Sequence, residues 1–291
     1  MAGGTARGMW ERYEPVHDLV YFAPEARQAA DRLGMRGFWM GYFALRAAPL
    51  GAVSPAVVSS CFYVFHPARV ARALPDAWGH AAPADVLAAR SEAMDAAMTR
   101  VFGPKAVESD ELAEAADLAW EAAAAADTPG RILAAANQAL ERPERPTVRL
   151  WQALTTLREH RGDGHVAVLV SLGIGPVEAM VLKAAAGESD GPFLRETRRW
   201  EPEDWAAAED VLRERGLLAE DGSLTRAGVA ERALVETRTD EAAERPWAAL
   251  GARRTARLAE LLDPLARAVG DSGMLPAGNP VGLPAGRFAA R

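Results

Sequence analysis

Residues 213–228 have the sequence RERGLLAEDGSLTRAG, and this stretch decides the fold class. The apolar residues 217–218 and Leu224 flank Asp221 and Gly222, a pair that is typical of a tight turn. Short apolar runs on both sides of such a turn predict a two-stranded hairpin, or wing.

Helical patterns surround this hairpin. The apolar spacing predicts helices over residues 148–159, 165–172, 177–186, 203–215 and 227–243. The polar segment 161–164 (RGDG) is expected to be a tight loop between the first two, with Asp163 capping the helix that begins near Gly164. The order helix, helix, turn, helix, helix, hairpin, helix is that of a winged helix-turn-helix.

The N-terminal half is also predicted to be helical. Helices are expected over residues 23–33, 38–48, 55–65 and 83–101, with two alanine-rich helices in 108–140. Ser54 and Pro55 form an N-cap followed by proline in the first turn, Pro67 ends that helix, and His66 is its last residue.

We therefore expect a mainly α protein with two winged-helix-like domains and small β-hairpin wings. The predicted divisions are an N-terminal degenerate winged-helix-like domain (1–141), a proline-rich linker (142–147), a winged helix-turn-helix domain (148–245), and a C-terminal helix with a Pro/Gly-rich arm (246–291). The two halves share an outline, which suggests a tandem duplication.

Composition limits the function classes. The chain has 291 residues, of which 49% are hydrophobic and 25% charged, with a net charge of −7, so it is globular and has no overall basic character. The one cysteine, Cys61, cannot form an internal disulfide and is expected to be buried and inert. No targeting segment or membrane span is recognisable, so we expect a cytoplasmic protein without a membrane partner. Nucleotide-binding and metal-binding motifs are missing, so no cofactor and no metal are predicted.

Residues 213–218 and 222–228 resemble the wing of MarR-type regulators, and this resemblance covers roughly residues 148–245. More of the chain resembles an actinobacterial family with a winged helix-turn-helix fold. The residues that carry this second resemblance are 10–25 (WERYEPVHDLVYFAPE), 36–50 (RGFWMGYFALRAAPL), 72–78 (RALPDAW), 151–165 (WQALTTLREHRGDGH) and 279–284 (NPVGLP). The resemblance implies the fold and no particular activity. By analogy with MarR-type proteins, the C-terminal helix either pairs two chains or clamps one, giving a homodimer or a monomeric pseudo-dimer.

DNA is not expected as a partner. The second helix of a helix-turn-helix enters the major groove and needs side chains that bond base edges. Here residues 176–186 offer only Glu178 and Lys183 among apolar or small residues, and the wing tip carries Glu220 and Asp221. This helix is therefore predicted to face inward.

Histidines supply the candidate catalytic groups. His17 lies on or near one helical face with Tyr21 and Glu25, and His66 follows an aromatic run, so these four are the catalytic candidates. His17 and His66 would act as acid and base, or alternatively as ligands to a metal or haem, although no metal-binding motif supports the second role. Each histidine taken alone fits a structural role better than a catalytic one.

Aromatic residues gather in the N-terminal half. The candidate ligand-binding residues are Phe38, Trp39, Tyr42, Phe43, Phe62, Tyr63 and Phe65, with His165 from the second domain. The cluster is either an aromatic core or the wall of an apolar pocket.

The function predicted from these observations is a winged-helix scaffold that has lost DNA readout and binds a hydrophobic or aromatic small molecule. It acts either as a cofactor-independent enzyme or as an accessory protein of specialised metabolism. One alternative is a ligand-responsive MarR-type regulator, which needs a basic face near residues 195–199. Another is a protein-interaction module, which needs an exposed apolar patch and no cavity.

Overall fold

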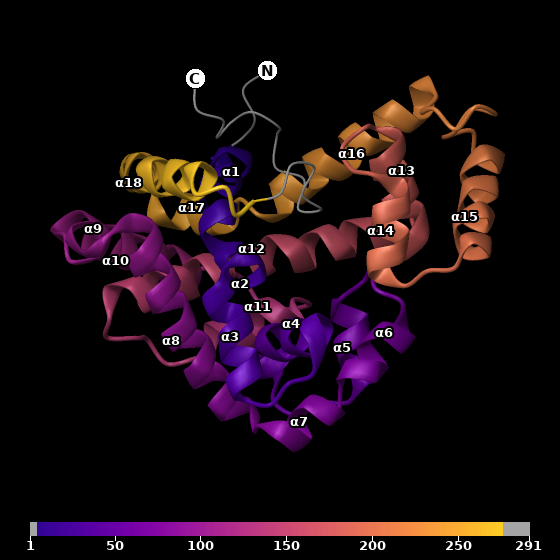
Figure 1. Ribbon diagram of the computed structural model, residues 1–291. Coiled ribbons are helices and arrows are strands. Elements are labelled where there is room, and N and C mark those ends of the chain that lie inside the picture. Colours follow the sequence, from indigo (N-terminus) through magenta and orange to yellow (C-terminus); the bar gives the residue numbers. More distant parts are fainter. Residues whose placement is uncertain (1–4, 276–291) are drawn as a thin grey trace.

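The computed structural model describes residues 5–275, which form a mainly helical molecule (Figure 1). The helices, in chain order, are α1 (Thr5–His17), α2 (Leu19–Phe22), α3 (Pro24–Arg32), α4 (Gly37–Ala47), the 3-10 turn η1 (Ala48–Leu50), α5 (Pro55–Cys61), α6 (Pro67–Ala73), α7 (Asp76–His80), α8 (Pro83–Phe102), α9 (Pro104–Val107), α10 (Asp110–Ala124), α11 (Ile132–Gln138), α12 (Pro146–Ser171), α13 (Pro176–Ala185), α14 (Gly191–Arg198), α15 (Pro202–Glu214), α16 (Arg226–Ala242), α17 (Arg245–Leu250) and α18 (Ala252–Asp271).

Helix α12 runs without interruption through the segment predicted to be a loop, so the predicted break at 161–164 is wrong. The glycines do not loosen the helix here, because Gly164 makes room for Arg131. A Cβ on Gly164 would lie 2.5 Å from Arg131 Nη1. The Arg131 guanidinium donates hydrogen bonds to the carbonyls of His160 (2.6 Å) and Ala242 (2.7 Å). Asp163 accepts from the Ala134 amide (2.9 Å) in the first turn of α11, so it caps a neighbouring helix and not its own.

Two hydrophobic cores are built on this helix, and we name the two parts of the molecule after them. The N-terminal lobe packs α1–α11, α17 and α18 around Leu150, Leu154 and Leu157 in the first half of α12. The C-terminal lobe packs α13–α16 around Leu169 near the end of α12. The predicted linker leads directly into α12, which both lobes share. The domain limits derived from the sequence stay a prediction.

The C-terminal lobe has the expected helix order but no two-stranded wing. Between α15 and α16 there is one antiparallel bridge, Leu218 with Leu224, and no strand is present anywhere in residues 5–275. The reason is that Thr225 follows the bridge directly and caps α16, its hydroxyl accepting from the Gly228 amide (3.0 Å). The predicted hairpin wings are therefore not confirmed in either half.

The N-terminal lobe confirms the predicted start of α5 and corrects its end. The Ser54 hydroxyl accepts from the Val57 amide and Pro55 is the first helical residue. The helix ends at Cys61 and does not continue to residue 65. His66 was expected to end this helix, but it is the N-cap of α6, where its Nδ1 accepts from the Ala68 amide (3.1 Å), because Pro67 fits the first position of a helix.

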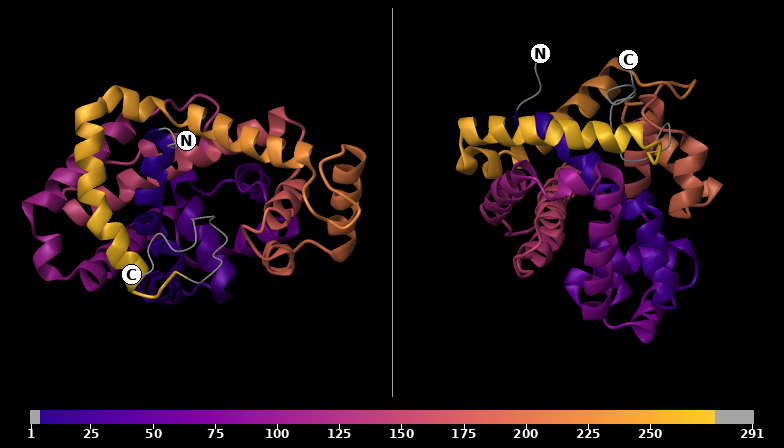
Figure 2. Two further views of the ribbon diagram at one scale, coloured as in Figure 1. Left: turned by 90° about the horizontal axis from the view of Figure 1, so that it is seen from above. Right: turned by 60° about the vertical axis from the view of Figure 1, so that its left-hand side comes forward.

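Helix α18 lies across α1 and α10 of the same chain (Figure 2). Its residues Leu258, Leu261 and Leu262 are buried in the N-terminal core. This apolar face therefore clamps the chain onto itself. The predicted Pro/Gly-rich arm lies largely in residues 276–291, outside the described residues. None of the described helices is by itself long and apolar enough to span a membrane; α12 and α13 meet that test only as a pair, bent by 100°.

A pair of glycine substitutions in α12 tests its continuity. We expect Gly164→Ala to destabilise the protein by about 1–3 kcal/mol, because the new methyl group displaces Arg131. Gly162→Ala is the matched control, since its Cβ would meet nothing closer than 3.4 Å. It should be neutral or stabilising by up to about 1 kcal/mol, as alanine favours helix over glycine. Denaturant unfolding of both variants measures this, and equal effects would contradict a continuous helix packed on Arg131.

Candidate ligand cavity

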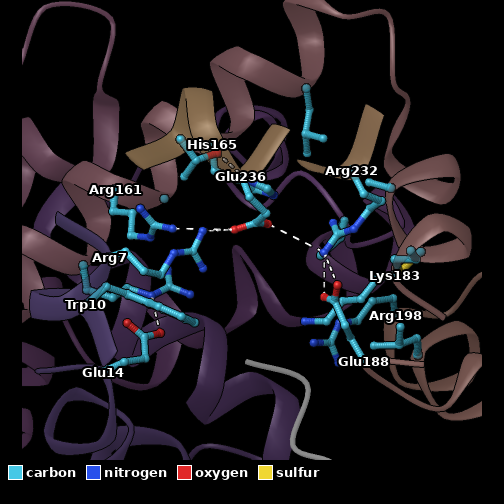
Figure 3. A pocket seen from close by; sticks show the side chains of 18 residues that line it. Arg7, Trp10, Glu14, Arg161, His165, Lys183, Glu188, Arg198, Arg232 and Glu236 are labelled. Atoms are coloured by element: carbon cyan, nitrogen blue, oxygen red, sulfur yellow. Dashed lines mark hydrogen bonds and ion pairs between the residues drawn. The ribbon is translucent and has the colours of Figure 1, made fainter. Parts of the chain in front are cut away.

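A cavity of about 590 Å³ lies between the two lobes (Figure 3). Its walls come from α1, α12, α13, α14 and α16, with Val64 from the loop after α5. Cavities of this size are typical of small-molecule sites.

Most of the polar lining comes from single faces of three helices. The residues are Arg7, Trp10 and Glu14 on α1, Arg158, Arg161 and His165 on α12, and Arg232, Glu236 and Thr239 on α16. In each set the members are three or four positions apart, so they lie along one side of their helix. Three helices therefore turn a polar stripe toward the same space.

Positive charge predominates in the cavity. Six of its lining residues are arginine or lysine, and three are glutamate. Glu236 lies at the centre, hydrogen bonded to Arg7, 3.7 Å from Arg161 and 3.6 Å from Arg232 (Figure 3). The Trp10 ring packs against the guanidinium groups of Arg7 (5.2 Å) and Arg161 (5.1 Å). Opposite charges thus hold most of these side chains in place.

One end of the cavity collects cations from three helices. Lys183 on α13, Arg198 on α14 and Arg232 on α16 face each other there, with Glu188 bonded to Arg232 at 2.5 and 2.6 Å. Burial, with Arg232 and Arg198 nearby, lowers the pKa of Lys183 to about 8, although Glu188 opposes this. Burial also lowers the pKa of Arg198. Burial and mutual repulsion thus disfavour the charged forms of Lys183 and Arg198, and a nearby anion would oppose both effects.

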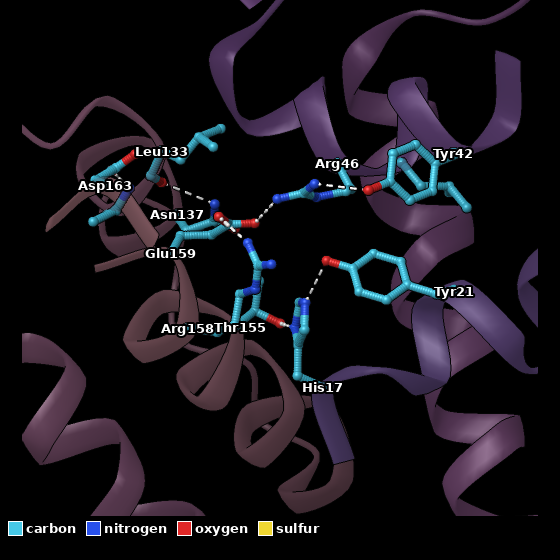
Figure 4. Close-up of polar contacts among 12 residues, drawn as sticks. His17, Tyr21, Tyr42, Arg46, Leu133, Asn137, Thr155, Arg158, Glu159 and Asp163 are labelled. Carbon is cyan, nitrogen blue, oxygen red and sulfur yellow. Dashed lines mark hydrogen bonds and ion pairs between the residues drawn. The ribbon is translucent and has the colours of Figure 1, made fainter. Parts of the chain in front are cut away.

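A buried polar network adjoins the cavity through Glu14 and Arg158, which line it (Figure 4). Arg158 pairs with Glu14 (3.3 Å) and with Glu159 (2.9 Å), and Arg46 pairs with Glu159 (2.8 Å). Burial alone would raise the pKa of Glu159, but Arg46 and Arg158 bring it down to about 2. Glu159 is therefore ionised and ties α12 to α4.

Two carboxyl groups in this network compete for charge. Glu14 and Asp18 are both buried, and neither oxygen of Asp18 has a hydrogen-bond partner in the described part of the chain. Burial and then Glu14 raise the pKa of Asp18 well above its usual range, and burial raises the pKa of Glu14. Each carboxyl thus disfavours ionisation of the other, while Arg158 opposes the rise in both pKa values.

The four predicted catalytic residues lie in three different surroundings. His17 and Tyr21 are together: His17 Nε2 is 2.8 Å from the Tyr21 hydroxyl, and its Nδ1 is 3.0 Å from Thr155 Oγ1. Burial and Arg158 lower the pKa of His17 far enough to keep it neutral. Glu25 forms an ion pair with Arg100 (2.5 Å), and His66 caps α6 beside Trp200.

Most of the predicted ligand-binding aromatics pack against one another. Phe43, Phe62 and Phe65 are buried, with Phe43 5.6 Å from Phe62 and 5.1 Å from Phe65 between ring centroids. Trp39 and Tyr42 contact the same rings, while Phe38 is exposed. A small hollow of about 30 Å³ beside Phe38 and Tyr42 holds roughly one water molecule.

The remaining two predicted residues lie between the lobes. The Tyr63 hydroxyl donates to the Ile174 carbonyl (2.7 Å) and so joins the two lobes. His165 lines the large cavity and hydrogen bonds Thr239 (2.9 Å). Burial lowers the pKa of His165 to about 4, so it is neutral at physiological pH.

Sequence reasoning missed the charged lining for one specific reason. The predicted break at 161–164 put Arg158 and His165 in separate helices, and so destroyed the register that places them with Arg161 on one face. An uninterrupted helical count over residues 158–165 would have revealed the stripe.

Comparisons with known proteins give one match. A family model described as a helix-turn-helix family matches residues 6–276. No curated protein and no solved structure matches. Within residues 5–275, no group of three or more His, Cys, Asp or Glu side chains is arranged to hold a metal ion.

The unpaired Asp18 carboxyl leads to a pH-dependent prediction. Because its folded-state pKa is raised, the folded protein binds more protons than the unfolded chain, and stability is lost as pH rises above about 4. Asp18→Asn removes this loss, so we expect it to stabilise the protein by about 1–3 kcal/mol at pH 8 and by much less near pH 4. Denaturant unfolding across this pH range measures the difference. The exposed Asp210→Asn serves as control, and a variant destabilised at every pH would refute the assignment.

Proposed function

The chain belongs to a helix-turn-helix family, and from this premise we propose that it is a small-molecule-binding protein whose helix-turn-helix unit forms a wall of the ligand cavity and has lost DNA readout. The likeness of the C-terminal half to MarR-type regulators and an actinobacterial origin are parts of the same proposal.

The observation that carries this proposal is the burial of α13, the helix in the reading position. All of its residues are buried or half-buried. Val177, Val181 and Leu182 pack in the C-terminal core, while Met180 and Lys183 line the cavity. A helix packed in this way presents no fully exposed side chain that could contact base edges in a DNA groove.

The neighbouring surface supports the same conclusion. Helix α15, directly before the turn that replaces the wing, exposes Glu203, Asp210 and Glu214, while the exposed Arg215 and Arg226 lie at the two ends of the turn. Glu220 and Asp221 are exposed at the turn itself. Phosphate groups would be repelled by this surface at any salt concentration that leaves the charges unscreened.

The cavity supports a ligand with an apolar body. Leu169, Met180 and Leu194 line it beside the charged residues, and Trp10 adds an aromatic face. The sequence suggested an apolar or aromatic ligand, and we retain that proposal but move the site from the N-terminal aromatic cluster to the cavity between the lobes.

A second candidate, a cofactor-independent enzyme, is favoured by Glu14. Its carboxyl lines the cavity, has one oxygen without a partner in residues 5–275, and has a pKa that burial raises. A protonated carboxyl at the edge of a cavity is suited to act as a general acid.

The test uses a probe that carries both an aromatic body and a charge, 8-anilinonaphthalene-1-sulfonate. We expect the wild-type protein to bind it and Ala179→Trp, which fills the cavity, to weaken binding at least about tenfold. Ala207→Trp places the same side chain on the exposed face of α15 and should leave binding unchanged. Fluorescence titration measures both.

The same preparations are titrated with random and genomic duplex DNA over a salt series. We expect no binding at physiological salt. Sequence-dependent DNA binding that persists at physiological salt would restore the regulator alternative. If Ala179→Trp leaves the affinity for the probe unchanged, the cavity is not the binding site.

A further inference from the structure

Building on the proposed function, we infer that the ligand is an organic acid whose anionic group binds Arg198, beside Lys183 and Arg232, and whose apolar body lies along Leu194, Met180 and Leu169. The inference rests on which cavity charges already have partners and on where the apolar wall begins.

Arg198 is the cavity cation without an acidic partner in the described part of the chain. Its neighbours are accounted for: Arg232 pairs with Glu188, and Arg161 pairs with Asp240 (2.7 Å). Arg7 pairs with the same acidic side of α16, and Arg158 with Glu14 and Glu159. For Arg198 there is no carboxylate within ion-pair distance among residues 5–275, and its Nε has no hydrogen-bond partner there. A half-buried guanidinium in this state has free capacity for an oxyanion.

The Arg198 side chain is also fixed in place. Its guanidinium carbon lies 4.8 Å from the centre of the Phe65 ring, and its Nη1 donates to Thr197 Oγ1 (2.8 Å). The backbone carbonyl of Arg198 accepts from the His66 amide (3.0 Å), which anchors the end of α14 to the N-terminal lobe. A guanidinium group that is already held in one orientation loses little conformational entropy when it binds a carboxylate.

The surrounding charges strengthen this site. Lys183 and Arg232 lie at the same end of the cavity and add positive potential, and burial together with these neighbouring cations lowers the pKa of Lys183. An anion placed here relieves the repulsion among the cations. Glu188 is already bonded to Arg232 through both oxygens, so it neutralises one of these charges and leaves Arg198 available.

The apolar residues decide between an inorganic and an organic anion. Leu194 lies one turn before Arg198 on α14, and Met180 lies three positions before Lys183 on α13. The apolar wall therefore begins directly next to the anion site, on the same two helices. A free inorganic ion would leave this wall in contact with water, whereas an organic acid covers it.

The experiment compares two probes that share a body and differ in charge, 8-anilinonaphthalene-1-sulfonate and the uncharged N-phenyl-1-naphthylamine. We expect Arg198→Gln to weaken binding of the sulfonate at least about tenfold and binding of the uncharged probe less than about twofold. Arg199→Gln, one residue further on and exposed, should change neither. Arg198→Lys keeps the charge but loses the planar guanidinium, so its affinity for the sulfonate should lie between those of the wild-type protein and Arg198→Gln. This variant remains informative if the glutamine variant does not fold.

The outcomes separate this inference from the function on which it rests. If Ala179→Trp blocks binding of the sulfonate but Arg198→Gln changes its affinity by less than about twofold, the cavity binds ligands and the assignment of Arg198 as the anion site is wrong. If inorganic phosphate at millimolar concentration displaces the sulfonate as well as dodecanoate does, the apolar part of the inference is wrong. Displacement by dodecanoate but not by 1-dodecanol is the expected result.

Discussion

The continuity of α12 is the constraint on which the rest of the structure depends. Its 26 residues span about 39 Å. Leucines in its first half belong to one core and Leu169 to the other, so this helix fixes the distance between the lobes. The stretch between the two apolar segments has no core to enter, and Arg158 and Arg161 there face the cavity. A break at Gly164 would let the lobes move independently, and Arg131 opposes such a break by bonding the carbonyl of His160.

The buried polar network beside the cavity is not what stability alone would favour. Buried charges cost several kcal/mol each when they leave water, and pairing only offsets that cost. This chain nevertheless buries Glu14, Asp18 and Glu159 around two arginines, and leaves Asp18 without a hydrogen bond among the described residues. Local violations of this kind are expected at functional sites, where binding or proton exchange compensates for lost stability. Arg198 lines the cavity, and Glu14 and Arg158 connect the cavity to the network that contains Asp18, which supports placing function there.

The sequence predicted what local chemistry determines and missed what distant residues determine. The cap at Ser54 and Pro55 was predicted correctly, because its hydrogen bond spans three residues. The helix-turn-helix class was likewise predicted, and the family match confirms it. The glycines of α12 suggested a loop because the residue that needs their space, Arg131, lies about thirty positions earlier in the chain. The predicted break also hid the cavity, because residues placed in two separate helices are not recognised as lying on one helix face. Only His165 among the predicted ligand residues lines the cavity, whereas its arginines were treated separately or not at all.

A ligand in this cavity would act on the contact between the lobes. Its walls come from α1 on one side and α13 and α14 on the other, so a bound molecule touches both. The direct polar links between the lobes include the hydrogen bonds from Tyr63 to Ile174 (2.7 Å) and from Trp200 to Val64 (2.8 Å). Each contributes about 1 kcal/mol, whereas a ligand at one hundred times its Kd contributes about 2.7 kcal/mol. In a regulator this linkage would alter the fit of the reading helix to DNA. Here residues of α13 line the cavity, so under the proposed function the same linkage stabilises the contact between the lobes around the ligand.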